Sequence, residues 1–309
     1  MSKYLLIFAL ILCGAPALAG TDIPVELYGE INVSYDSNDP GDDDWESYVS
    51  RLGLKGAYKL NGNLQIVYQV EQEVDVVSGG TERDTLLGTR NSFVGLKGKY
   101  GTIYFGAHDT PFKKAQNKMD QFNDQAGDIK NLLVGEVRAK DTWFYHSPKY
   151  NGWQFQGMLI PSDSNFDSSK SASLLYKSDD WDFGFGVDAD TRKNDRSVNR
   201  TNVYDSLRAS AQFTPGSWKF GLIVQRSEQQ NAPGADSETG YVASVAYKVN
   251  NWSLLAQHGD SDIVGSDVTS SNVGVHYNFT KGTKAYIYYW DYDKGGDSDT
   301  LSIGVEHKF

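Results

Sequence analysis

The chain has 309 residues, with 29 Lys and Arg against 40 Asp and Glu, and is long enough for two ordinary domains or one large β architecture. Its net charge of −11 argues against nucleic acid as a partner. The 19 Tyr, 14 Phe and 31 Gly against only 8 Pro favour strands joined by tight turns.

The N-terminal residues predict a leader that is removed during Sec-dependent export. Lys3 supplies a positive charge, Tyr4–Leu12 is apolar, and residues 17–19 read Ala-Leu-Ala, an A-x-A cleavage site. We therefore expect a signal peptide over residues 1–19. Its removal takes away Cys13, the only cysteine, so we expect neither a disulfide nor thiol chemistry. It also leaves 28 basic against 40 acidic residues, a net charge of −12.

The first segment after the leader alternates strictly between apolar and polar residues. Leu27 and Ile31 share one face, while Glu26 and Glu30 share the other, which is the period of a β-strand. Similar runs continue to the end of the chain, and we count sixteen. They cover residues 25–35, 51–60, 64–71, 89–98, 102–108, 136–146, 153–160, 170–178, 181–191, 202–213, 218–227, 238–249, 252–259, 268–279, 283–292 and 299–309.

The connections between these runs alternate in length. Short turns such as Asn61-Gly62 alternate with longer segments rich in Asp, Ser, Asn and Gly, and aromatic residues gather beside the short turns. No apolar run reaches the ~18 residues of a transmembrane helix, and the mean hydropathy of −0.50 also fits strands with one polar face. An even strand count with unequal ends is typical of an outer-membrane barrel.

One segment breaks this rhythm. Residues Asp109–Gly135 form a polar stretch that is far longer than a usual connection, and loops beyond ~12–15 residues are usually functional or disordered. We predict that this segment folds into the barrel and narrows a pore.

At this point the sequence resembles a known family, the trimeric general porins of Gram-negative outer membranes, especially the neisserial and proteobacterial branch. The resemblance rests on VELYGEI (25–31), SRLGLKG (50–56), YQVE (68–71), RNSFVGLKGKYGTIYFG (90–106), DTPF (109–112), YHSPKYNGWQF (145–155) and the terminal Phe309. It implies a sixteen-stranded antiparallel transmembrane β-barrel over residues 20–309, with the inward third loop at 109–135. It also implies a homotrimer and passive diffusion of small hydrophilic solutes.

Two departures from the family pattern remove positive charge. Ala107 follows Gly106 where the family often has Arg, and Glu30 stands where the enterobacterial branch has a basic residue. The net charge of −12 acts in the same direction. We therefore predict a weak preference for cations.

Strand parity and the resemblance together predict the residues of the pore constriction. The basic wall consists of Arg51, Arg90 and Arg138, and because the register there is open by two residues, Glu136 is the rival of Arg138. The inward loop offers acidic residues that would face this wall, and Glu30 joins them from the first strand. These acidic residues are Glu30, Asp109, Asp120, Asp124, Asp128 and Glu136. Rings of charge of this kind bias ion selectivity.

The expected partners follow from an outer-membrane location. They are two further copies of the chain, lipopolysaccharide and outer-membrane lipid, and the barrel assembly machinery, which would read Phe309. We expect no cofactor and no metal. The Asp-rich outer segments lack the fixed Gly and Glu of a calcium-binding EF-hand, which favours solvated loops over a Ca²⁺ or Mg²⁺ site.

Three other classes of function remain to be weighed. An enzyme is disfavoured because no G-x-S-x-G or H-E-x-x-H motif is present. A secreted soluble β-protein would leave its alternating apolar faces in water. A substrate-specific channel is the main alternative, with stacking surfaces on Tyr28, Tyr104, Tyr286, Tyr288 and Trp290.

Overall fold

The computed structural model describes residues 24–78, 87–162, 168–192, 202–232, 234 and 236–309, so the predicted signal peptide lies outside the described residues. One antiparallel sheet contains all the strands. They are β1 (Glu26–Asp39), β2 (Asp44–Ser47), β3 (Arg51–Asn61), β4 (Leu64–Val74), β5 (Leu87–Thr89), β6 (Ser92–Gly98), β7 (Gly101–Asp109), β8 (Arg138–His146), β9 (Trp153–Ile160), β10 (Ser169–Lys177), β11 (Trp181–Arg192), β12 (Val203–Phe213), β13 (Trp218–Gln229), β14 (Ser237–Val249), β15 (Trp252–Ser261), β16 (Val268–Asn278), β17 (Thr283–Asp293) and β18 (Asp297–Lys308).

The eighteen strands make a barrel of sixteen. β1 pairs with β2 through Val33–Asp36 and with β3 through Glu26–Glu30, so β2 and β3 are one strand with a break. β5 and β6 likewise both pair with β4. Eighteen minus these two gives sixteen, which confirms the predicted all-β fold and strand number.

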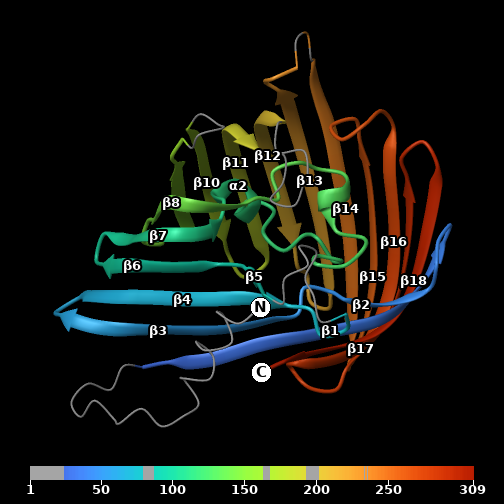
Figure 1. The fold of residues 1–309 in the computed structure, drawn as a ribbon, viewed down its shortest axis with the longest axis horizontal. Helices are drawn as coiled ribbons and strands as arrows, with labels where there is room; N and C mark the ends of the chain where they lie inside the picture. Colours follow the sequence, from blue (N-terminus) through green and yellow to red (C-terminus); the bar gives the residue numbers. More distant parts are fainter. Residues whose placement is uncertain (1–23, 79–86, 163–167, 193–201, 233, 235) are drawn as a thin grey trace, which may run out of the picture.

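The two ends of the chain close the barrel. β1 and β18 pair from Glu30 opposite Lys308 to Asp39 opposite Asp299, and Figure 1 shows the blue first strand beside the red last strand. The terminal residue extends this pairing. Gly29 N donates to Phe309 O at 3.0 Å, and Phe309 N donates to Gly29 O at 3.1 Å. The sheet therefore has no free edge, as spanning a membrane requires.

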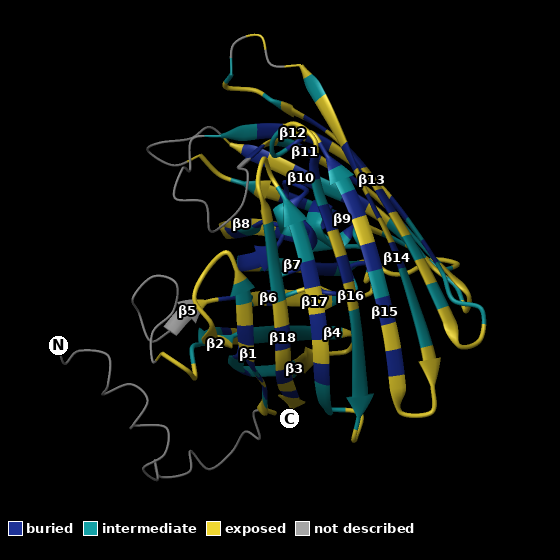
Figure 2. Cartoon of the chain, turned by 90° about the vertical axis from the view of Figure 1, so that its right-hand side faces the viewer, coloured by how far each residue is buried: buried dark blue, intermediate teal, exposed yellow. Residues whose placement is uncertain are grey.

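The predicted alternation of faces is present along the barrel wall. In β1, Leu27 is 58% and Ile31 44% exposed on the outside, while Asn32 and Ser34 are buried on the inside. Figure 2 shows the same alternation of exposed and buried bands along β13 and β15. Among the described residues, no helix is long and apolar enough to cross a membrane.

Aromatic rings gather at the short-turn end of the barrel, as predicted. Trp181 stacks on Phe213 with 4.4 Å between ring centroids, and Trp218 lies 4.5 Å from Tyr247. Tyr100, beside a short turn, is 76% exposed. Such a belt is typical of the membrane–water interface.

The segment between β7 and β8 enters the barrel. It contains the short helix α2 (Pro111–Lys114) and the 3₁₀ turn η1 (Ile129–Asn131), and Figure 1 shows it in green within the ring of strands. Its apolar residues form the core of the molecule together with the inner wall. The largest cluster joins Met119, Ile129 and Leu133 of the segment to Ile223 of β13 and Val242 of β14. We call residues 110–137 the inward loop.

Deleting Phe309 should weaken barrel closure, because both hydrogen bonds to Gly29 are lost, at about 0.5–1.5 kcal/mol each. We expect a lower midpoint for the heat-induced mobility shift on a gel. Phe309→Leu keeps both backbone bonds and is the matched control. Equal midpoints for the deletion and the unchanged protein would contradict this account.

Candidate functional site: a charged constriction inside the barrel

Lumen-facing polar side chains hold the backbone of the inward loop against the wall. Met119 O accepts a hydrogen bond from Ser244 Oγ at 2.7 Å, and Gly127 O accepts from Asn272 Nδ2 at 3.0 Å. Side chains of the barrel interior thus donate hydrogen bonds to carbonyl groups of the loop that are not paired within a helix or strand. Further contacts of the same kind run from Ser210 to Ala115 O, from Gln225 to Val134 O and from Tyr292 to Asn131 O.

Glycines in the wall leave room for this close approach. A Cβ atom built at Gly184 of β11 would lie 2.2 Å from Ala115 O, and one at Gly259 of β15 would lie 2.4 Å from Leu132 Cδ1. A side chain at either position would displace the inward loop from the wall. The residues of the wall, as well as those of the loop, therefore determine the path of the inward loop across β11–β16.

The tip of the inward loop is held by aromatic packing. Phe122 is fully buried, and its ring centroid lies 5.3 Å from that of Tyr288 and 6.5 Å from that of Trp290, both on β17. Tyr286 belongs to the same cluster. Three of the five aromatic residues that sequence analysis offered as stacking surfaces for a solute thus lie beneath the loop.

Two of the predicted acidic residues fold the loop itself. Asp120 accepts from Phe122 N at 2.9 Å and from Ile129 N at 3.2 Å, while Asp128 caps η1 by accepting from Lys130 N at 2.8 Å. Burial, reinforced by the neighbouring Asp128, raises the pKa of Asp120. The structure therefore places Asp120 and Asp128 inside the loop fold, rather than opposite the basic wall.

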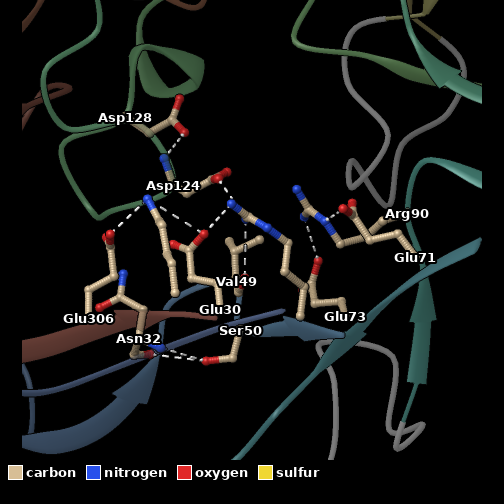
Figure 3. A network of polar contacts seen from close by, with 12 residues as sticks. Glu30, Asn32, Val49, Ser50, Glu71, Glu73, Arg90, Asp124, Asp128 and Glu306 are labelled. Atoms are coloured by element: carbon tan, nitrogen blue, oxygen red, sulfur yellow. Dashed lines mark hydrogen bonds and ion pairs between the residues drawn. The ribbon is translucent and has the colours of Figure 1, made fainter. Parts of the chain in front are cut away.

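Asp124, by contrast, reaches the basic wall. Its carboxylate lies 3.3 Å from Arg51 NH1, and Arg51 also bonds Glu30 on β1. Figure 3 labels Asp124 and Glu30 in this network. Although burial works against its ionisation, Arg90 and Arg51 lower the pKa of Asp124. Asp124 is thus charged at neutral pH, and its pairing joins the loop tip to β3.

Arg90, the second residue of the predicted basic wall, pairs with two other carboxylates. Arg90 Nε lies 2.9 Å from Glu71 Oε1, and Arg90 NH1 lies 3.1 Å from Glu73 Oε2 (Figure 3). Neither Glu71 nor Glu73 is among the predicted constriction residues. Both are on β4, where their spacing of two places them on one face.

A third group surrounds Asp109 at the end of β7. Its carboxylate lies 3.0 Å from Arg138 NH2 and 3.0 Å from Lys114 Nζ. Lys113 is 3.9 Å from both Asp109 and Glu136. Burial opposes the charged ammonium, yet Asp109 and Glu136 raise the pKa of Lys113. The structure thus brings Arg138 and Glu136, the two rival residues, into one network.

The most deeply buried cation of the site, Arg208 on β12, is not among the predicted constriction residues. Its side chain is fully buried, lies 2.7 Å from Glu136 Oε1 and sits over the Phe112 ring at 4.4 Å. Strand parity could have identified it, because Ser206 and Ser210 are buried on the same face. None of the family motifs found in the sequence lies on β12, so the resemblance does not point to Arg208.

Breaks in the sheet position the charged residues. Arg51 begins β3 directly after the break that separates it from β2, and Arg90 lies between β5 and β6. The β7–β8 register shifts between Gly106 and His108, next to the pair formed by Asp109 and Arg138. Such irregularities re-aim side chains and are frequent at functional sites.

A cavity of about 820 Å³ lies beside the short-turn end of β1, β3, β4 and β6–β9. Its lining includes Lys55, Lys97, Phe93 and Tyr104. No group of three or more His, Cys, Asp or Glu in the described part of the chain is arranged to hold a metal ion.

A comparison with protein families decides what kind of barrel this is. The model of the family described as "Gram-negative porin" matches residues 7–305. The chain belongs to this porin family. Members of the family are channels of the outer membrane, so the charged network described above lies inside the lumen of a channel.

Curated relatives and solved structures agree with this assignment. The porin is 25% identical to the major outer membrane protein P.IB of Neisseria meningitidis serogroup B, over 98% of this chain and 99% of that protein. It resembles the anion-selective porin from Comamonas acidovorans (TM-score 0.71, 17% identity, 93% and 100% covered). It also resembles OmpF of Salmonella typhi in a complex with daunomycin (TM-score 0.75, 14% identity, 93% and 98% covered). The two structural likenesses show the fold alone.

Replacing Arg208 with Met should destabilise the porin by about 3–5 kcal/mol, because it leaves Glu136 buried without its closest cation. The double variant Arg208→Met/Glu136→Gln should recover part of this loss. Arg226→Met, at an exposed position on β13, is the control and should change stability by less than about 0.5 kcal/mol. Thermal unfolding in detergent measures all three, and a double variant no more stable than Arg208→Met would refute the pairing.

Proposed function

We propose that this porin is a general diffusion channel for ions and small hydrophilic solutes, with a weak preference for cations. The observation that carries the proposal is the close balance of charge at the constriction. Arg51, Arg90 and Arg138 each lie within 3.3 Å of at least one carboxylate oxygen. Paired charges of this kind leave only a small net potential to select one sign of ion.

The sign of the preference rests on features outside the paired groups, because the constriction itself is balanced. The carboxylates of Glu30, Glu71, Glu73, Asp109, Asp124 and Glu136 face an equal number of cations, namely Arg51, Arg90, Lys113, Lys114, Arg138 and Arg208. Ala107, where the family often has Arg, adds no charge. The net charge of the chain acts in the same direction.

The constriction residues remain assigned by geometry and resemblance. The proposal places Arg51, Arg90, Arg138, Glu30, Glu136, Asp109 and Asp124 along the narrow part of the channel. Asp120 and Asp128 act indirectly, since they hold the loop in its folded form. Residues 110–137 would then be the element that sets the width of the pore.

We also propose that the channel is a homotrimer. OmpT of Vibrio cholerae, described as a trimer form, matches the fold with a TM-score of 0.70 at 16% identity, over 93% of this chain and 99% of that one. Lipopolysaccharide, the assembly machinery that reads Phe309 and the cleaved leader over residues 1–19 stay predictions. Chemical cross-linking in detergent would test the number of subunits.

Asp124→Asn should shift selectivity toward anions, because the paired Arg51 then loses one carboxylate. One unit charge at 4 Å is worth about 1 kcal/mol in water, so the cation-to-anion permeability ratio should fall by up to about fivefold. Reversal potentials in a KCl gradient across a planar bilayer measure the ratio. The shift should be larger at 0.1 M than at 1 M salt, since screening is weaker there.

Asp43→Asn removes the same charge from an exposed outer segment and is the matched control. It should shift the reversal potential much less than Asp124→Asn. Clear anion selectivity of the unchanged porin would overturn the proposed preference, whatever the variants do.

A solute titration separates the general channel from a substrate-specific one. We expect ohmic single-channel current with no saturable block by sugars or aromatic acids, because Tyr286, Tyr288 and Trp290 are each only 2% exposed beneath the loop. Saturable block by one solute would favour the substrate-specific alternative, with Tyr28 and Tyr104 as the remaining stacking surfaces, of which Tyr104 lines the lumen cavity.

A further inference from the structure

Lysines concentrate inside the barrel at its short-turn end. In β14, Val242 and Ser244 are buried on the inner face, so Lys248 follows on that face. In β13, Ile223 and Gln225 place Lys219 inward by the same alternation. The lysines on inner faces at this end are Lys55, Lys59, Lys97, Lys177, Lys219, Lys248, Lys284 and Lys308.

Carboxylates on the same inner faces are fewer. In the described strands they are Glu26, Glu30, Asp182 and Glu306. Each is already paired: Glu26 with Lys55 at 3.0 Å, Glu30 with Arg51 and with Lys308 at 3.7 Å, Asp182 with Lys177 at 2.9 Å, and Glu306 with both Lys284 and Lys308. Since the lysines outnumber these partners, the short-turn end of the lumen carries excess positive charge.

This charge faces open space. Lys55, Lys97 and Lys149 line the cavity of about 820 Å³, in which Glu26 is the only acidic lining residue. Lys97 and Lys248 are exposed to solvent. In outer-membrane barrels the short turns lie at the periplasmic side. The basic zone is thus the periplasmic vestibule of the channel.

The opposite end of the barrel is acidic. Asp36 faces inward from β1 beyond the constriction, toward the long connections. The described connections and strand ends at this side add further exposed acids, with the cations Lys170, Arg226 and Lys294 among them. The exposed acids are Asp42, Asp43, Asp44, Asp262, Asp267 and Asp297, while Asp75 and Asp293 at the same side are half-buried.

We propose that this porin is a rectifying channel, in which an acidic extracellular zone and a basic periplasmic vestibule lie in series. The inference rests on the proposed function as an open diffusion channel. It adds that the conductance of this channel depends on the sign of the voltage. Neither zone alone selects strongly between cations and anions. The constriction, whose charges are balanced, lies between the two zones.

The direction of rectification follows from which ions each mouth admits. When the extracellular side is positive, cations enter through the acidic mouth while anions enter through the basic vestibule, so both accumulate in the channel. When the polarity is reversed, cations have to enter through the basic vestibule and anions through the acidic mouth. Like charge repels both, and the channel is depleted of ions. Conductance is therefore higher with the extracellular side positive, and small anions enter most readily from the periplasm.

The test is a current–voltage curve of single porin insertions with known orientation. Ser266→Cys, in the exposed β15–β16 connection, supplies a thiol for an impermeant label added to one side, because Cys13 lies in the predicted leader. At 0.1 M KCl, where the screening length is about 10 Å, conductance should be about 1.5-fold higher with the extracellular side positive. At 1 M KCl the ratio should approach one.

The variant Lys97→Gln/Lys177→Gln/Lys248→Gln should bring the ratio at 0.1 M KCl close to one. The matched control Lys170→Gln/Arg226→Gln/Lys294→Gln removes the same charge from exposed positions outside the vestibule and should keep the rectification. A symmetrical curve for the unchanged porin, the opposite polarity, or equal loss in both triple variants would overturn the inference alone. A folded protein that forms no channels would overturn the proposed function as well.

Discussion

Closure of the backbone hydrogen-bonded ring is the constraint on which the rest of this structure depends. A spanning strand in lipid has no water to satisfy its amide groups, so the sheet must pair its first strand with its last. The pairing of β1 with β18, extended by Gly29 and Phe309, meets this requirement. Closure also fixes the alternation of faces, since every second residue must then point into an enclosed aqueous space.

That enclosed polar wall is what allows a long irregular segment inside the barrel. A loop in an apolar core would leave its carbonyl groups unsatisfied, whereas here Ser244 and Asn272 donate to it. Phe122 adds an apolar anchor on β17. The loop is therefore held at many points along its length, and its tip can present one carboxylate, Asp124, to the opposite wall.

The sequence was informative wherever a period of two governs the structure. Strand number and inward faces could be predicted, because alternation in a barrel leaves only two possible faces for each residue. The closing role of Phe309 comes from the structure. The roles of individual acids were less accessible. Asp120 and Asp128 read as pore charges but cap the loop fold, and that depends on local backbone geometry that no alternation specifies.

Long-range pairing was the other limit of sequence reasoning. Arg208 and Glu136 are 72 positions apart and meet only because the inward loop returns along β12. The breaks in the sheet that orient Arg51 and Arg90 cannot be recognised in a pattern of apolar and polar residues either. A single residue left out of the strand pairing changes the register without changing the composition. The sequence predicted these arginines and the two carboxylates that pair with Arg51, Glu30 and Asp124, but not the partners of Arg90, Glu71 and Glu73.

The partners change what the basic wall can do. An arginine row that faces a distant acidic loop would generate a field across open water, whereas Arg51 and Arg90 are neutralised locally by Glu30, Glu71 and Glu73. Interactions between charges beyond a screening length of about 10 Å are weak at 0.1 M salt. We therefore expect selectivity in this porin to depend less on the constriction alone than on how charge is distributed along the axis, with acids toward the long loops and lysines toward the short turns.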